Sequence, residues 1–91
     1  MNTSKNRTKA ITVKHMGVMT IVQFARELGI KTERGTVWSW KSGERAPSVE
    51  TLSEVLKSPA STPNAKAWAR ECLAVVLPDV TVTVTEPEQA S

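Results

Sequence analysis

Apolar residues over residues 24–56 recur at the three- and four-residue intervals of α-helices. Phe24 and Leu28 share one face of a short helix. Thr20 can accept a hydrogen bond from the backbone N–H groups at the start of this helix, and Gly29 can adopt the left-handed conformation that ends it. The pattern therefore predicts a capped amphipathic helix between these two residues.

Two more helices are predicted in the same stretch. Val37 and Trp40 share a face of a helix over about residues 36–42, which Gly43 ends. Ser48 can then cap a third amphipathic helix. The β-branched and aromatic residues of the second segment favour a strand, so a hairpin turning at its final glycine is the alternative. We prefer the helix because glycine and proline signals bracket it on both sides.

The flanking segments carry different patterns. Residues 10–16, AITVKHM, suit a helix or a turn, but their β-branched residues also suit a short strand. Residues 58–63 read as a linker, and Thr62 can cap a further helix that ends before Pro78. Over residues 80–85 valine alternates with threonine, which predicts a strand with one apolar face.

The composition is that of a small, mildly basic globular domain. The 91 residues include 12 Lys and Arg against 9 Asp and Glu, so the net charge is +3 and the pI about 9.4. Basic residues crowd the N-terminal segment and acidic residues the C-terminal one. This balance fits binding to nucleic acid, although many unrelated domains are equally basic.

Several classes of function are not expected. A single cysteine, Cys72, excludes an internal disulfide, and His15 is the one histidine, too few ligands for a zinc site. No apolar run approaches the roughly 20 residues of a membrane span, and no arrangement of residues resembles a catalytic site. We therefore expect a cytoplasmic protein that is not an enzyme and has no metal, cofactor, small-molecule ligand or membrane partner.

One motif resembles a known family. The pattern W-x-x-G-x-x-x-P-S-x-E-T-L, from Trp40 to Leu52, resembles the helix-turn-helix domain of phage repressors and Cro proteins, the lambda-repressor-like or XRE-type class. Phe24-Ala25, Leu28-Gly29 and Val37 also match this class, although the interval from Gly29 to Val37 is longer than usual. The resemblance implies that the second motif helix lies in the major groove of DNA.

The predicted fold is mainly α, with roughly four to five short helices around a helix-turn-helix and a C-terminal strand. We expect a basic disordered arm over residues 1–9 and the DNA-binding domain over residues 10–57. A C-terminal helix and strand over residues 62–85 would serve dimerisation, and residues 86–91 would form a disordered acidic tail. The strand would pair across a dimer or with residues 11–13.

The resemblance also assigns residues to DNA contacts. Arg34 is the first choice for a base contact, because a guanidinium can donate two hydrogen bonds to guanine O6 and N7. The positions that match base-contacting ones are Arg34, Gly35, Ser39 and Ser42. Phosphate contacts are expected from Thr20, Lys31, Thr36, Lys41 and Arg45, and from the basic arm residues Lys5, Arg7 and Lys9.

The three tryptophans have separate expected roles. Trp40 matches a core position, and Trp68 belongs either to the core or to a dimer contact. Trp38 is expected to pack under the loop over residues 45–47, with exposure as the alternative. The expected dimer interface comprises Trp68, Cys72, Val76, Val80, Val82 and Val84.

The expected function is a sequence-specific transcriptional regulator that occupies operator DNA as a homodimer, at the nucleoid of a bacterial host. One alternative is a phage excisionase or Cox-like directionality factor, in which the GERAP segment would turn into the wing of a winged helix. The other is a protein-interaction module, antirepressor-like or antitoxin-like, using Trp38 or the Trp68 helix. SVETLSEVL favours the regulator, because it reads as a full helix where a wing would need a strand.

Overall fold

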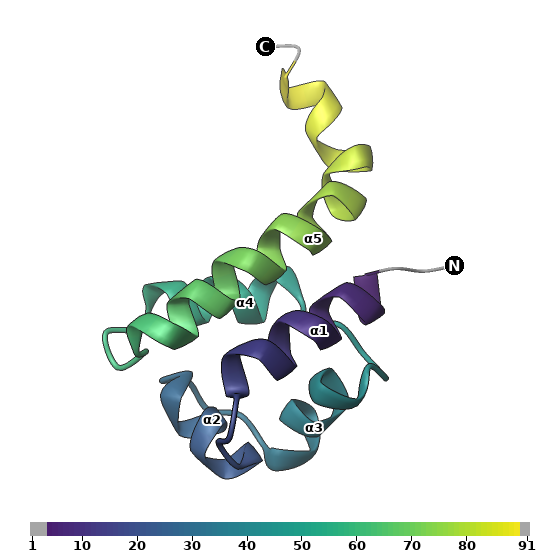
Figure 1. Ribbon diagram of the computed structural model, residues 1–91. Coiled ribbons are helices and arrows are strands. Elements are labelled where there is room, and N and C mark those ends of the chain that lie inside the picture. Colours follow the sequence, from purple (N-terminus) through teal and green to yellow (C-terminus); the bar gives the residue numbers. More distant parts are fainter. Residues whose placement is uncertain (1–3, 90–91) are drawn as a thin grey trace.

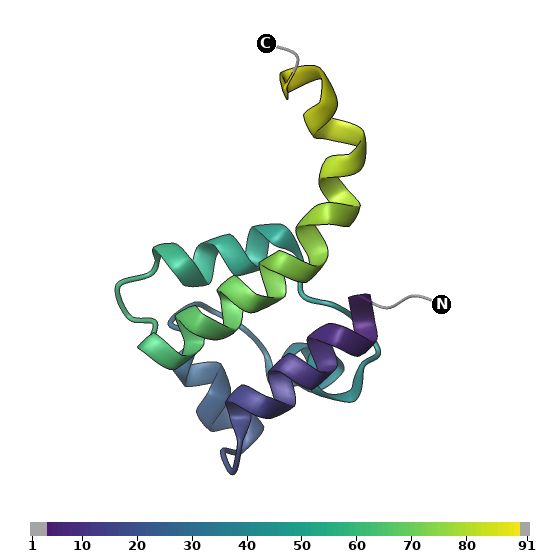
Figure 2. The same ribbon diagram turned by 45° about the horizontal axis from the view of Figure 1, so that its top comes forward.

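The computed structural model describes the backbone of residues 4–89 and the side chains of residues 4–77, and within this range the chain is helical and has no strand. The helices are α1 (Ser4–Met16), α2 (Ile21–Glu27), α3 (Arg34–Ser42), α4 (Val49–Lys57) and α5 (Pro63–Gln89). In Figure 1, α1 crosses the molecule between the α4–α5 pair and the α2–α3 pair. In Figure 2, after a 45° turn, α5 lies between α4 and α1, and α3 lies behind α1. The mainly α fold is thus confirmed.

The starts of α2 and α4 and the end of α3 lie where the capping residues predict them. Thr20 Oγ1 accepts a hydrogen bond from Gln23 N (3.1 Å), and Gln23 Oε1 accepts one from Thr20 N (2.9 Å), which is a complete capping box at the start of α2. Ser48 Oγ accepts a hydrogen bond from Thr51 N (3.1 Å) and caps α4 in the same way. Gly43 has a φ of 86° and ends α3, so the helix expected here is present and the hairpin is not.

The linker over residues 58–62 closes the C-terminal end of α2. Ser58 Oγ donates a hydrogen bond to Gly29 O (2.7 Å), and Ser61 Oγ donates one to Leu28 O (2.6 Å). Gly29 has a φ of 70°, and a Cβ at this position would lie 2.5 Å from the Ser61 backbone nitrogen. Glycine is therefore required here both for the turn and for the close approach of the linker.

An aromatic cluster joins four helices at the centre of the core. Trp68 of α5 packs edge-to-face on Phe24 of α2, with ring centroids 5.4 Å apart and planes at 88°. Trp40 of α3 lies at the same centroid distance, with its ring tilted by 35°. The Trp68 indole Nε1 donates a 2.9 Å hydrogen bond to Thr12 Oγ1 of α1, so its polar atom is also satisfied.

The N-terminal segment differs in part from its expectation: residues 10–16 are helical, which is the interpretation we favour for them, but the helix begins earlier than expected. Residues 4–9 belong to α1 and are not a disordered arm, and residues 11–13 are helical and not a strand; residues 1–3 lie outside the described range. Thr8 and Thr12, one turn apart, are fully buried, and Thr8 Oγ1 donates a hydrogen bond to Ser4 O (2.8 Å). These two threonines form the face by which the segment packs on the rest of the chain, and a pattern of apolar residues gives no signal for it.

The C-terminal segment also differs. The helix does not end before Pro78, and residues 80–85 are not a strand, because α5 continues to Gln89. A lone strand leaves half of its backbone groups unpaired, and within residues 4–89 no other strand is present to pair with it. Figures 1 and 2 show α5 bending away from the other helices in its second half, as expected for a helix with an internal proline.

The expected dimer interface is corrected as well. Trp68 and Cys72 are fully buried and Val76 is 7 % exposed, all within the chain's own core. As placed in this fold, these three side chains cannot form a contact surface for a second copy. The side chains of Val80, Val82 and Val84 lie outside the described ones.

Candidate nucleic-acid interface

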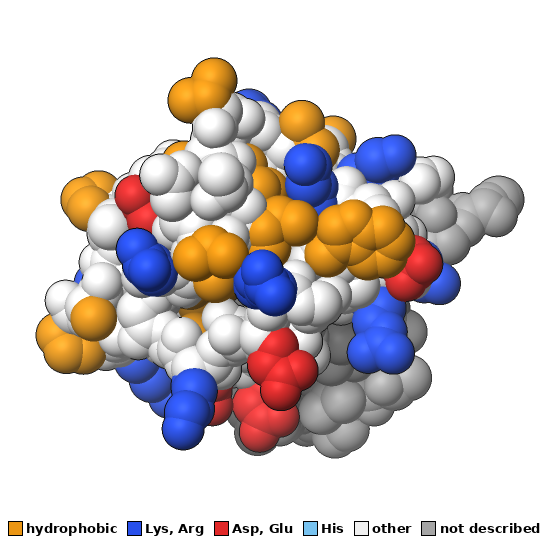
Figure 3. Space-filling view, turned by 90° about the horizontal axis from the view of Figure 1, so that it is seen from below, with side chains coloured by type: hydrophobic (Ala, Val, Ile, Leu, Met, Phe, Trp, Pro, Cys, Tyr) orange, Lys and Arg blue, Asp and Glu red, His pale blue; other side chains and the backbone are white. Residues whose placement is uncertain are grey.

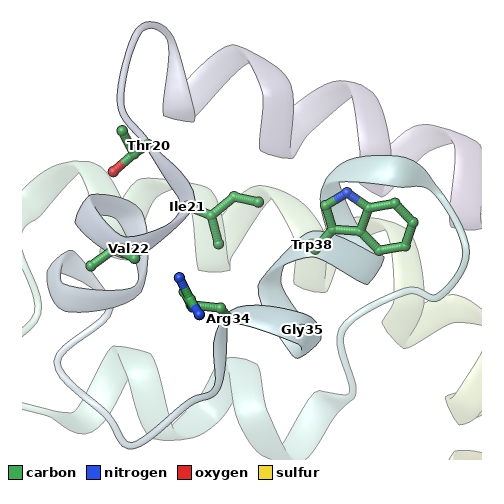
Figure 4. Close-up of a pocket in the computed structure, with 6 residues that line it drawn as sticks. All are labelled: Thr20, Ile21, Val22, Arg34, Gly35 and Trp38. Atoms are coloured by element: carbon green, nitrogen blue, oxygen red, sulfur yellow. The ribbon is translucent and has the colours of Figure 1, made fainter.

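An open groove lies between the first turns of α2 and α3. It has a volume of about 480 Å³ and is lined by Thr20, Ile21 and Val22 from α2 and by Arg34, Gly35 and Trp38 from α3. Figure 4 shows these six residues around the groove. The capping box starts α2 at Ile21, and the packing of α2 against α3 brings their first turns together.

Arg34 and Gly35, which are expected to contact bases, lie in the exposed first turn of α3. Arg34 is the first residue of α3, one turn before the buried Val37, and it is exposed. In Figure 4 its side chain extends toward α2. A Cβ built on Gly35 would meet nothing within 4 Å, so the backbone is open to close approach at this point. The start of α3 is two residues earlier than expected, which places both residues inside the helix.

The two serines of α3 are less available than expected. Ser39 is only 6 % exposed, and its Oγ donates a hydrogen bond to Thr36 O (2.6 Å). The loop after α3 folds over it, since Arg45 N donates to Ser39 O (3.1 Å). This burial corrects the assignment of Ser39 as a base contact. Ser42 is half-buried and its Oγ donates to Ser39 O (3.3 Å), which leaves it at the edge of the exposed face.

The residues expected to contact phosphates are at the surface, and Thr20 is the one of them that lines the groove. Thr20, Lys31, Thr36, Lys41 and Arg45 are all exposed. A second depression continues from the first one past Val22 and Arg34, and Arg26 and Lys31 lie along it. Acidic residues are also near, because Glu33 and Glu44 line two neighbouring depressions. These share Lys31 and Thr32 with the second depression and Gly35 with the groove.

The basic residues of the N-terminal segment are carried by a helix. Lys5, Arg7 and Lys9 are exposed on α1. The Lys9 side chain lies against Gly43, since a Cβ on that glycine would be 3.0 Å from Lys9 Cδ. This places a positive charge near the C-terminus of α3, where the helix dipole favours a cation.

Trp38 is exposed, which corrects the expectation that it packs under the loop after α3. It is 48 % exposed and lies one helical turn from Arg34. Val18, in the turn before α2, is fully exposed. Figure 3 views the molecule from the side of α2 and α3 and shows apolar side chains on this face, with Lys and Arg around them and acidic side chains also beside them.

Sequence reasoning missed the apolar part of this face. Ile21 and Val22 are both half-buried and line the groove beside Trp38. A signal for them is present in the sequence. Two adjacent apolar residues directly after the capping Thr20 cannot both face the core of a helix, because neighbours differ by about 100° around its axis.

A separate polar cluster joins α1 to α5. Lys14 Nζ lies 2.7 Å from Glu71 Oε1, and His15 Nε2 lies 2.9 Å from Glu71 Oε2. His15 Nδ1 is 2.9 Å from Asn64 Oδ1, while Asn64 Nδ2 donates to the His15 carbonyl (3.0 Å). The hydrogen bond from Lys14 and the contact with His15 lower the pKa of the Glu71 carboxyl below its ordinary value. These contacts are a structural link between the two helices.

A metal site and a membrane-spanning helix are both absent from the described residues. Among them no group of three His, Cys, Asp or Glu side chains could hold a metal ion. No helix within the described range is long and apolar enough to span a membrane. Comparison with protein-family models, curated proteins and solved structures found no significant match to this chain.

Proposed function

We propose that this protein is a sequence-specific DNA-binding transcriptional regulator of the phage repressor or Cro kind, which occupies operator DNA with α3 in the major groove. The observation that carries the proposal is the exposed first turn of α3, where Arg34 and the open backbone at Gly35 stand beside the start of α2. An α-helix about 10–12 Å across fits the major groove, which is about 12 Å wide.

The charges around α3 support the same orientation. Arg26, Lys31 and Arg34 line the two joined depressions, and neither depression is lined by an acidic residue. Phosphates on one side of the groove would meet these cations, and the exposed hydroxyl of Thr20 could donate to a phosphate while its lone pair caps α2. Such contacts fix the register of the protein on DNA and leave base reading to Arg34.

We also propose that the protein acts as a homodimer in the bacterial cytoplasm, bound at the nucleoid. One helix-turn-helix reads about half an operator, and in dimers of this class the two reading helices lie one DNA turn, about 34 Å, apart. The dimer contact must be formed by surface residues other than the buried Trp68, Cys72 and Val76.

The test is a selection of bound sequences from random duplex DNA at near-physiological salt. A palindromic motif with two equal half-sites is expected, and the affinity for it should fall steeply with added salt because phosphate contacts release counterions. If no motif emerges and the remaining binding depends only on salt, the proposal is wrong.

Two alternative functions make use of other features of the chain. The excisionase alternative requires a wing after Pro47, but that segment leads into the helix α4, which favours the regulator. The protein-interaction alternative is favoured by the exposed Trp38. It predicts no selected DNA motif, together with stoichiometric binding of a partner protein that the Trp38→Ala substitution weakens.

A further inference from the structure

The groove between α2 and α3 has one polar and one apolar part. Arg34 supplies its charged group, while Ile21, Val22 and Trp38 supply apolar side chains. Trp38 is 48 % exposed, whereas Val37 and Trp40 of the same helix are buried in the core. A large exposed indole in such a groove indicates that the groove is a contact surface for a binding partner.

The chemistry of the DNA major groove offers one apolar group that would fit this part. Thymine is the one standard base that presents a methyl group there, at C5, while the other base edges present hydrogen-bond donors and acceptors. Apolar side chains can contact that methyl and cannot satisfy a polar base edge. Arg34, one helical turn away on α3, supplies the donors for a guanine.

We infer that Trp38, together with Ile21 and Val22, forms a contact for the C5-methyl group of a thymine next to the base read by Arg34. This inference rests on the proposed function and adds to it a second specificity-determining residue, which reads by apolar contact. It assigns to the operator half-site a guanine and a neighbouring thymine.

Charge complementarity favours DNA over a protein segment as the occupant. The two joined depressions carry three basic side chains, Arg26, Lys31 and Arg34, and no acidic one. An apolar strip beside these basic side chains matches a thymine-bearing base step flanked by phosphates. The acidic side chains Glu33 and Glu44 line neighbouring depressions and not these two.

The experiment uses the duplex selected by the wild-type protein and copies in which each thymine is replaced in turn by deoxyuridine, which lacks only the methyl group. We expect the wild type to lose affinity about fourfold at one thymine per half-site, the effect of one buried methyl-sized group. The Trp38→Ala variant should bind the thymine and deoxyuridine duplexes equally well. Val13→Ala, which trims another exposed apolar side chain on α1, should keep the wild-type loss.

The outcomes separate the two proposals. If the wild type selects no duplex, the proposed function fails and this inference fails with it. If a duplex is selected but no deoxyuridine copy binds more weakly, or the loss persists in Trp38→Ala, then this inference alone is wrong. Because Trp38 is exposed, the variant should retain its helical circular dichroism, and a second variant, Trp38→Gln, should give the same loss of discrimination.

Discussion

The indole Nε1 of Trp68 donates a 2.9 Å hydrogen bond to Oγ1 of Thr12, which lies 56 residues earlier in the chain. Both side chains are fully buried, so the bond joins α5 to α1 in a place that water does not reach. The same indole packs on Phe24 and Trp40. This hydrogen bond therefore ties α5 to α1, and α1 in turn packs against α3.

Removing the acceptor of this bond should destabilise the fold. Thr12→Val keeps the shape of the side chain but leaves the Trp68 N–H without a partner, at a cost of about 1–3 kcal/mol in the free energy of unfolding. Thr12→Ser keeps the hydroxyl and should retain most of the stability. Denaturant unfolding measures both, and a Thr12→Val variant as stable as the wild type would show that the bond is unimportant.

Alanine substitutions at two glycines distinguish the effect of backbone strain on stability from the effect of a steric clash. Gly17 and Gly29 have φ values of 54° and 70°, so alanine is strained at both by about 1–2 kcal/mol. A Cβ at Gly17 meets nothing within 4 Å, whereas one at Gly29 would lie 2.5 Å from Ser61 N. Gly29→Ala should therefore lower the melting temperature distinctly more than Gly17→Ala. Equal decreases in melting temperature would mean that the close contact between Gly29 and the linker over residues 58–62 does not make alanine more destabilising there.

The link between α1 and α5 should weaken in acid. The hydrogen bond from Lys14 and the contact with His15 lower the pKa of Glu71 in the folded chain, so its contribution is complete above the ordinary value of 4.5 and is lost as the pH falls through the lowered pKa. The pair with Lys14 is exposed, so the contribution should be below about 1 kcal/mol.

Unfolding of the wild type and Glu71→Gln at several pH values measures this contribution. The difference between them should be largest near neutral pH and should shrink below pH 4.5. Glu54→Gln, an exposed site on α4, is the matched control and should show no such trend. A difference that grows in acid would reverse the assigned sign.

The buried thiol should report on unfolding. Burial raises the pKa of Cys72 to about 12, so the reactive thiolate is scarce in the native protein at ordinary pH. Labelling with a thiol reagent at pH 8 should be slow in the native state and should become rapid in denaturant. Fast labelling under native conditions would show that α5 opens readily from the core.

The sequence allowed the motif helices to be predicted because their ends are decided locally. Thr20, Gly29, Gly43 and Ser48 each act through a hydrogen bond or a left-handed backbone within a few residues. Such signals need no knowledge of the rest of the chain. The start of α3 is predicted two residues too late, because Glu33 makes no side-chain capping hydrogen bond that would mark it.

Features that depend on distant partners could not be predicted in the same way. The helical state of residues 4–9 depends on the burial of Thr8 and Thr12, and sequence periodicity gave no sign of it. The valine and threonine alternation predicted a strand, yet a strand requires a neighbour that the described fold lacks. Ser39 points outward by its position on the helix, but the loop that returns at Arg45 covers it.

The measurement that tests the account most directly compares two arginine variants on the selected duplex and on copies with the guanine of each half-site replaced. Arg34→Ala should weaken binding by about 1–3 kcal/mol and abolish discrimination at one base position. Arg70→Ala removes the same charge from an exposed site on α5 and should leave both unchanged. If the two variants behave alike, or if Arg34→Ala weakens binding to all sequences equally, then Arg34 does not read a base and α3 does not lie in the major groove as proposed.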